Sequence, residues 1–189
     1  MLGKEALFRP PIDCAFQLIL DLSGRRPASS LPRRLDGLFR ALAAPRTKQA
    51  ADEIEELIWA IWISHEDREA EESMGAAVEA LADGALGEAR PLLDELVLRY
   101  PDWAEAWNKR ATLAFVENRD ADATRDIMKT LELEPRHFGA VSGFGQICLR
   151  HGHLNEARAA FQIALSLNPH LEGLREMIDD LSPRTLMLH

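Results

Sequence analysis

Two histidines and a cysteine stand close together in the last third of the chain, and these residue types can hold a metal ion. The group consists of Cys148, His151 and His153. A structural zinc site needs four ligands at characteristic spacings, and this spacing matches no zinc signature. Both histidines also fall in a segment that reads as a tight turn between helices, where polar residues are routine. We therefore expect no metal site and no cofactor.

Three further groups have residue types that catalysis or nucleotide binding uses, but not the required spacing. Residues 143–145 read GFG like the start of a dinucleotide fingerprint, yet Cys148 occupies the third glycine position and no strand precedes it. Ser142 lacks the glycine that precedes the serine of a nucleophile elbow. Acidic pairs such as Glu55 and Glu56 are adjacent and point to different parts of a helix surface. These patterns favour a protein that is not an enzyme.

The strongest pattern in the chain is a repeat of 34 residues, marked by Pro101, Pro135 and Pro169. Each proline closes a segment with the same internal order of residue types, and the segments align without a gap. The three segments are 70–103, 104–137 and 138–171. Internal repeats of this length indicate stacked helical hairpins rather than one globule.

Besides the proline column, three columns of this alignment hold the same kind of residue in every repeat, and each has a physical reason. The fifteenth residue tolerates a positive φ, which allows a helix to stop, and the proline at position 32 ends the second helix. The eighth and twentieth residues are small, so the two helices can approach to about 8–10 Å. The columns contain Ala77, Ala111 and Gly145; Gly84, Asn118 and Gly152; and Ala89, Ala123 and Ala157. Each segment is therefore predicted to form two helices joined by a turn.

The pattern resembles the tetratricopeptide repeat family. The middle repeat carries the resemblance most clearly, with AEAWNKRA at 104–111 and LELEP at 131–135. It departs from the family pattern at Asp120, where an apolar residue usually packs, and at Thr130, where alanine is usual. In the first repeat, Ser73 replaces an expected aromatic residue. The resemblance covers about 102 of the 189 residues and implies an all-α solenoid of antiparallel helical hairpins.

In this family the first helix of each repeat lines a concave face along which partner peptides lie. By alignment, the peptide-binding residues here would be Glu71, Met74, Val78, Glu105, Asn108, Lys109, Thr112, Ser142, Gln146 and Arg150. Asn108 and Gln146 can hydrogen-bond a peptide backbone, and Lys109 and Arg150 can take a carboxylate. The alternative is that these side chains are merely solvated.

One specialisation of the family grips the C-terminal carboxylate of a chaperone with basic and amide side chains. The matching positions here hold Met74, Val78, Lys109, Gly139 and Gly143. Because one of the five is basic, this carboxylate clamp is absent, and the expected ligand is an ordinary peptide segment or helix.

Both ends of the repeat region are predicted to be covered, because a stack of hairpins must shield its last apolar faces. Upstream, helices over 32–43 and 47–63 form a degenerate hairpin that we expect to cap the first repeat. Trp59 and Trp62 in this hairpin fit a packing role better than a partner-binding patch. Downstream, an apolar stripe over 171–181 predicts a capping helix.

The first 30 residues are predicted to hold one short helix, with Asp13 and Gly24 at its ends. A secretory signal is the rival interpretation, but Asp13, Gln17 and Asp21 would interrupt its apolar core. No apolar run approaches the ~18–20 residues of a membrane span. We expect a cytoplasmic protein, with an exported or periplasmic protein as the alternative.

Charge is distributed unevenly along the chain, whose net charge is −9. Residues 52–103 hold fifteen acidic and three basic side chains. Such a surface would repel a phosphate backbone, so we expect no nucleic-acid partner. The acidic block is either solvated, or attracts a basic partner, or folds against the chain's own arginines Arg25, Arg26, Arg33 and Arg34.

Taken together, these patterns predict a non-enzymatic protein–protein interaction module that binds a partner peptide or helix in its concave groove. An adaptor, an assembly role and a chaperone-like role all fit. The alternative is a structural protein that self-associates through Trp59 and Trp62 or its terminal helix, and an enzyme with an unrecognised site ranks last. We expect a monomer or weak homodimer. The predicted segments are 1–30 (short helix or flexible), 31–69 (hairpin), 70–103, 104–137 and 138–171 (repeats 1, 2 and 3), and 172–189 (capping helix and tail).

Overall fold

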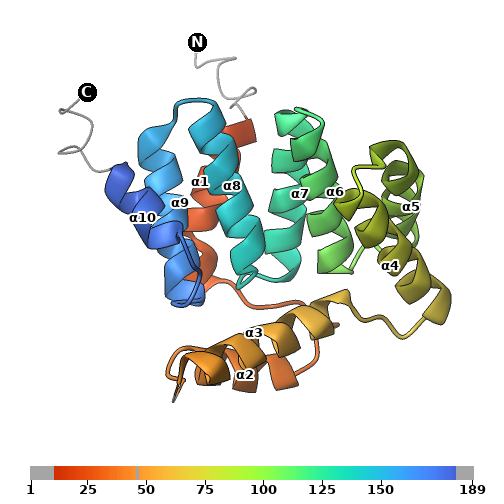
Figure 1. Cartoon of the computed structure of the whole chain (residues 1–189), viewed down its shortest axis with the longest axis horizontal. Helices are drawn as coiled ribbons and strands as arrows, with labels where there is room; N and C mark the ends of the chain where they lie inside the picture. Colours follow the sequence, from red (N-terminus) through yellow and green to blue (C-terminus); the bar gives the residue numbers. More distant parts are fainter. Residues whose placement is uncertain (1–10, 46, 182–189) are drawn as a thin grey trace, which may run out of the picture.

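The computed structural model describes residues 11–45 and 47–181, and its regular elements are all helices (Figure 1). They are α1 (Pro11–Leu20), the short 3-10 helix η2 (Leu22–Gly24), α2 (Arg34–Leu42), α3 (Lys48–Ile63), α4 (Arg68–Ala82), α5 (Leu86–Arg99), α6 (Ala104–Val116), α7 (Asp120–Leu133), α8 (Phe138–Arg150), α9 (Leu154–Leu167) and α10 (Leu174–Asp180). The predicted all-α solenoid is confirmed: α4–α5, α6–α7 and α8–α9 are antiparallel hairpins stacked in chain order.

The helix stops predicted from the repeat are confirmed by backbone conformation. Gly84, Asn118 and Gly152 have φ values of 72°, 59° and 75°, in the left-handed region that a helix end uses. The second helices α5, α7 and α9 each end two residues before the proline of their repeat. Asn118 is the one non-glycine residue with positive φ among the described residues, and asparagine tolerates this conformation better than most side chains.

The small-residue columns hold the two helices of each hairpin together. Ala77, Ala89, Ala123 and Ala157 are fully buried. At Gly145 the helices are so close that an added Cβ would lie 2.7 Å from Cδ1 of Phe161. The ring of Phe161 is itself fully buried, so it has no free space into which to move.

Gly145→Ala should therefore lower the free energy of unfolding by about 1–3 kcal/mol, because the new methyl group overpacks the third hairpin. Urea denaturation measures the change. The matched control is Gly75→Ala on the exposed side of α4, where an added Cβ meets nothing within 4 Å. There alanine should stabilise the helix by about 0.5–1 kcal/mol. Equal responses of the two variants would contradict the close helix approach at Gly145.

The stack curves with its first helices on the inside. Helix α6 contacts both α4 and α8, so the first helices of successive repeats lie close together. The opposite, outer layer of second helices receives α1, which packs against α7 and α9. Ala15, Leu18 and Ile19 of α1 belong to the main apolar core of the molecule. We call the exposed side of α4, α6 and α8 the concave face.

The ends of α1 differ from the sequence-based expectation. The helix begins at Pro11, so Asp13 lies in its first turn and is not the residue before it. Gly24 ends η2 without a positive φ, so it does not form the expected left-handed cap. The predicted C-terminal helix is present as α10, and Leu174 packs against the main core.

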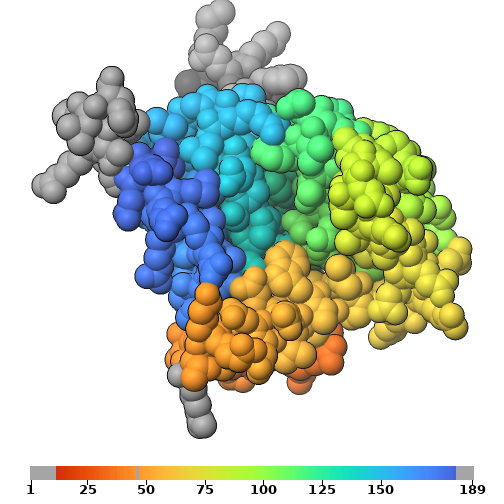
Figure 2. All heavy atoms as spheres, in the orientation of Figure 1, coloured from red at the N-terminus to blue at the C-terminus, as the bar shows by residue number. Residues whose placement is uncertain are grey.

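The α2–α3 hairpin does not lie at the open end of repeat 1, where we expected it. It runs along one edge of the stack, beside α8, α9 and α10 (Figures 1 and 2). Ile58 and Trp62 share an apolar cluster with Phe138 at the start of α8. The side-chain amide of Asn168 donates a 2.7 Å hydrogen bond to Glu55 of α3. The prediction that this hairpin caps the first repeat is therefore wrong.

Charged residues explain why repeat 1 needs no cap. In repeats 2 and 3, the third and tenth residues face the preceding repeat and are buried. These residues are Ala106 and Leu113 in repeat 2, and Ala140 and Ile147 in repeat 3. The matching residues of repeat 1, Glu72 and Glu79, are exposed. A terminal repeat with a polar outer face can end a solenoid without a covering element.

Candidate functional site

The ten side chains that we predicted for peptide binding fall into three groups. Met74, Glu105 and Asn108 are buried, at 1%, 0% and 7% exposure. Lys109 and Arg150 form ion pairs within the chain. The open residues, fully or half exposed on the concave face, are Glu71, Val78, Thr112, Ser142 and Gln146.

Neither predicted cation is free to take a carboxylate from a partner. Lys109 Nζ lies 3.0 Å from an oxygen of Glu105. Arg150 lies 2.7 Å from Asp120 and also donates to the backbone oxygen of Phe115. Asp120 replaces the apolar residue that is usual at this repeat position, and the structure shows that its negative charge is matched by Arg150. Both cations that we expected to recognise a ligand therefore take part in ion pairs within the chain.

Glu105 is the centre of a buried polar network at the start of α6. One carboxylate oxygen is 2.8 Å from Nε2 of His137, and the other is 3.0 Å from Lys109. Asn108 donates to both oxygens. On the other side of the imidazole, Nδ1 of His137 accepts a hydrogen bond from the backbone N–H of Ala140. Because Nδ1 accepts, Nε2 carries the proton and donates to Glu105.

The network determines the charge state of Glu105. Burial by itself raises the pKa of this carboxyl group. The hydrogen bond from His137 and the nearby positive charge of Lys109 outweigh burial, and the net pKa lies below its ordinary value of 4.5. Glu105 is therefore a carboxylate whose charge is balanced inside the protein, not a group available to a ligand.

Two tryptophans of α3 cover this network. The ring of Trp62 stacks on the imidazole of His137 at a centroid distance of 4.0 Å, and Trp59 meets the same ring edge-on at 5.6 Å. Trp59 also packs against Gly139, where an added Cβ would lie 2.7 Å from the indole. The backbone oxygen of Trp62 accepts a 2.7 Å hydrogen bond from the indole of Trp103. Trp62, at 2% exposure, is a packing residue and not a partner-binding patch.

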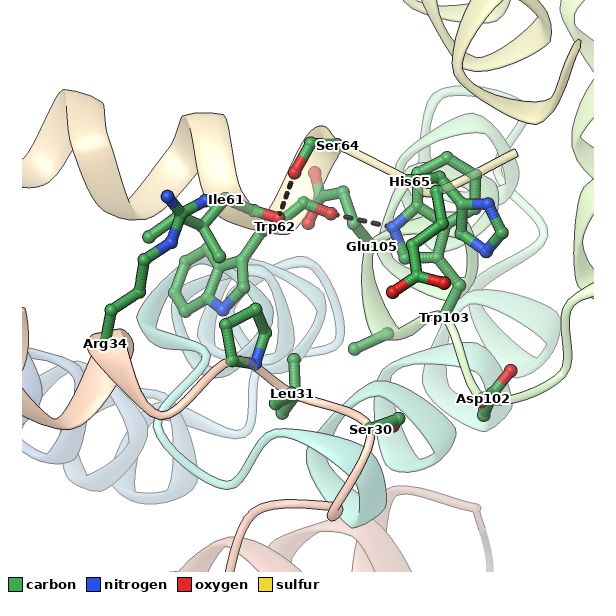
Figure 3. A pocket seen from close by; sticks show the side chains of 13 residues that line it. Ser30, Leu31, Arg34, Ile61, Trp62, Ser64, His65, Asp102, Trp103 and Glu105 are labelled. Atoms are coloured by element: carbon green, nitrogen blue, oxygen red, sulfur yellow. Dashed lines mark hydrogen bonds between the residues drawn. The ribbon is translucent and has the colours of Figure 1, made fainter. Parts of the chain in front are cut away.

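A cavity lies beside these tryptophans (Figure 3). Its volume is about 510 Å³, and it separates the hairpin from the start of α6. Ile61, Trp62 and Trp103 form its apolar walls, with Arg34 and Asp102 toward opposite ends. The sequence analysis did not find this cavity, because its walls come from three separate segments, 30–34, 61–66 and 102–105, and no motif links them.

Two side chains that could act as metal ligands or nucleophiles, Cys148 and His151, are buried or paired within the chain. Cys148 is fully buried, and burial, aided by the charge of Glu156, raises the pKa of its thiol to about 12. His151 lies 2.8 Å from Asp120. Within residues 11–45 and 47–181, no three His, Cys, Asp or Glu side chains are grouped to hold a metal ion. None of the helices in the same ranges is long and apolar enough to cross a membrane.

The hypothesis that the acidic block folds against the chain's own arginines is wrong for the described residues. Arg25, Arg26, Arg33 and Arg34 are exposed, and none of them forms an ion pair there. The acidic side chains of α4 and α5 that form ion pairs do so with other arginines, such as Arg99 with Glu69 and Glu95.

Several residues that shape this region had no signal in the sequence analysis. His137 lies in the loop after α7 and Asn168 in the loop after α9, and both are fully buried. Their roles depend on Glu105 and Glu55, which are 32 and 113 residues away. The proximity of Asn168 to a proline hints at a turn, but not at a partner in α3.

Comparison with known proteins shows a curated relative of this chain. No protein-family model matches the chain. Over 169 residues the chain is 34% identical to a TPR repeat-containing protein of Rhizobium etli, and the match spans 85% of this chain and 79% of that relative. Since the aligned part includes most of both proteins, the likeness extends beyond a single repeat.

Proposed function

This chain belongs to the tetratricopeptide repeat family, and on that premise we propose that it is a non-enzymatic protein-interaction module that binds a partner peptide or helix on its concave face. Family membership supports interaction with other proteins in general terms. The position of the binding surface, and its use in an adaptor, assembly or chaperone-like role, are parts of our proposal.

The observation that carries the proposal is the set of exposed and half-buried side chains on the concave face, none of which forms an ion pair within residues 11–45 and 47–181. Thr112 and Glu71 are exposed, and Val78, Ser142 and Gln146 are half-buried. They combine apolar surface with hydroxyl and amide groups that can donate to and accept from a peptide backbone. In contrast, the lower part of this face, at the start of α6 and α8, is covered by Trp59 and Trp62.

The non-enzymatic part of the proposal rests on the surroundings of the reactive side chains. The Cys148 thiol is buried and its pKa is raised to about 12, which disfavours the nucleophilic thiolate. His137 is held between Glu105 and a backbone N–H. Its imidazole is covered by Trp62, so no substrate reaches it in this arrangement.

Self-association through the hairpin is less well supported than partner binding. The pairing surface would require Trp62, which is buried within the chain. At the other end, Leu174 of α10 is also buried against the main core. We therefore place the working surface on the concave face and not on the hairpin or α10.

Substituting two exposed residues of the concave face tests this assignment. Glu71→Arg combined with Thr112→Arg should leave folding intact because both side chains are exposed. The double variant should reduce the amount of partner captured from native lysate by about tenfold or more, equivalent to ~1.4 kcal/mol. Quantitative mass spectrometry of the proteins retained by wild-type and variant bait gives the ratio.

The matched control is Leu98→Arg on α5, in the outer layer, where the leucine is 81% exposed. This variant also introduces arginine on the surface, but away from the concave face. It should retain the partner that the double variant loses. If both baits, or neither, lose the partner, the concave face is not the binding surface.

A further inference from the structure

Trp62, which lines the cavity beside the α2–α3 hairpin, carries a hydrogen-bond donor that the described part of the chain leaves unpaired. The indole Nε1 of Trp62 is buried and has no hydrogen-bond partner among the residues that the structure describes. Buried N–H groups in folded proteins nearly always have an acceptor. In Figure 3 the nitrogen edge of this ring faces the side of the cavity where Leu31 lies. The donor points toward a cavity wall that is not part of a helix.

A second unpaired donor lines the same cavity. Arg34, in the first turn of α2, is exposed and has no ion pair within residues 11–45 and 47–181. Its guanidinium offers several N–H groups in a plane that suits a carboxylate. In Figure 3, Arg34 and Trp62 lie toward the end of the cavity opposite Asp102.

The cavity's own buried carboxylate cannot satisfy these donors. Glu105 lines the cavity, but its oxygens already accept from Asn108, His137 and Lys109. Ile61 provides an apolar wall beside Arg34, and Trp103 provides one on the side of Asp102 (Figure 3). The cavity therefore has the Arg34 guanidinium at one end and apolar side chains along its walls, with the Trp62 N–H buried behind its loop wall. Its volume of about 510 Å³ is typical of small-ligand sites.

We propose that this cavity is a second binding site, for a carboxylate attached to an apolar group. The carboxylate would pair with Arg34 and accept the N–H of Trp62, while the apolar group packs against Ile61 and extends toward Trp103. A C-terminal residue of a polypeptide and a small free organic acid share this chemistry. The site uses neither the open residues of the concave face nor the clamp positions of the repeats, so it does not depend on the proposed groove.

Access to the Trp62 N–H requires movement of a loop and not of a helix. The wall over it belongs to the segment 25–33, which has no regular secondary structure. One backbone hydrogen bond, 2.7 Å from Ala28 N to Leu133 O, ties this segment to the repeats. A shift of this loop would open the donor to a ligand while α2, α3 and the repeats keep their positions.

Calorimetric titration of the full chain with two matched compounds tests the proposal. N-acetyl-L-leucine carries the carboxylate, and N-acetyl-L-leucinamide has the same apolar body without the charge. The acid should bind with a dissociation constant of about 1 mM or lower. The amide should bind at least about tenfold more weakly, because it cannot form the charged pair with Arg34. Equal affinities, or no saturable binding of the acid, would overturn the proposal.

Variants locate the site. Arg34→Gln and Trp62→Phe should each weaken binding of the acid by about tenfold, since each removes one donor. Arg33→Gln is the control, because it removes a neighbouring exposed charge that does not line the cavity. Arg34 is exposed, so its variant tests the site even if Trp62→Phe folds poorly. Unchanged affinity in Arg34→Gln, or an equal loss in Arg33→Gln, would show that the acid binds elsewhere.

A third compound separates the two possible sources of the ligand. N-acetyl-alanyl-leucine extends the acid by one peptide unit and keeps the free terminus. Tighter binding than that of N-acetyl-leucine identifies the terminus of a polypeptide as the ligand. Weaker binding identifies a small free acid. Either result supports recognition of the carboxylate, provided that Arg34→Gln weakens binding of the compound.

Discussion

Replacing Glu105 by alanine is expected to lower the free energy of unfolding by about 3–5 kcal/mol, because it breaks a buried ion pair from one side. The substitution leaves the Nε2–H of His137 and the amide of Asn108 without their acceptor. It also removes the carboxylate that balances Lys109. The midpoint of urea denaturation, at unchanged slope, measures the loss.

Two further variants show whether burial and charge cause this effect. Glu71 occupies the same position in repeat 1 and is exposed, so Glu71→Ala should change stability by no more than about 0.5 kcal/mol. Glu105→Gln keeps an acceptor for His137 but removes the charge, and its loss should be intermediate. Similar effects of Glu105→Ala and Glu71→Ala would contradict the buried network.

The network also predicts how stability depends on pH. The pKa of Glu105 is lower in the folded protein than its ordinary value of 4.5. The unfolded chain therefore takes up the proton first as the pH falls. The stabilisation by Glu105 is fully present above about 4.5 and is lost as the pH falls through the folded pKa. The stability difference between wild type and Glu105→Gln should shrink in that acidic range, and a constant difference would contradict this assignment.

Trp62→Ala is expected to lower the free energy of unfolding by a similar amount, about 3–5 kcal/mol, because removing a large buried side chain leaves a cavity. The indole stacks on His137 and packs against Phe138, so its removal separates the hairpin from the repeats. Loss of the unpaired N–H recovers a small part of this energy. The melting temperature should fall. In addition, limited proteolysis should show faster cleavage within the segments 25–33 and 64–67, which flank the hairpin.

Leu57→Ala is the control in the same helix. Leu57 is 53% exposed, so its truncation should change stability by no more than about 0.5 kcal/mol and leave the cleavage rate unchanged. If Trp62→Ala melts and is cleaved like Leu57→Ala, the tryptophan does not hold the hairpin in place.

The local features of the repeats could be predicted because they depend on neighbouring residues. A residue at Gly84, Asn118 or Gly152 must adopt a positive φ for the helix to stop, and this requirement selects its type. Similarly, Phe161 can pack only where Gly145 leaves room. Such constraints recur in every repeat, so one sequence contains three copies of the signal.

The candidate site could be predicted only in part. Alignment to the family pattern identifies which side chains of α6 would line the concave face, including Glu105, Asn108 and Thr112. It cannot tell that Trp59 and Trp62, more than 40 residues earlier, cover the first two and leave Thr112 open. For the same reason, Lys109 looked like a free cation until the structure showed its pairing with Glu105.

The sequence by itself determined that this chain forms helical hairpins stacked in order, because turn conformation and close helix packing act over a few residues and repeat at a fixed interval. Only the tertiary structure decided where the α2–α3 hairpin lies, which polar groups are buried beneath it, and that a cavity with an unpaired Trp62 N–H remains beside it. These features depend on the shape and charge of surfaces from distant segments. A single pattern of residue types is compatible with several such arrangements, and packing selects among them.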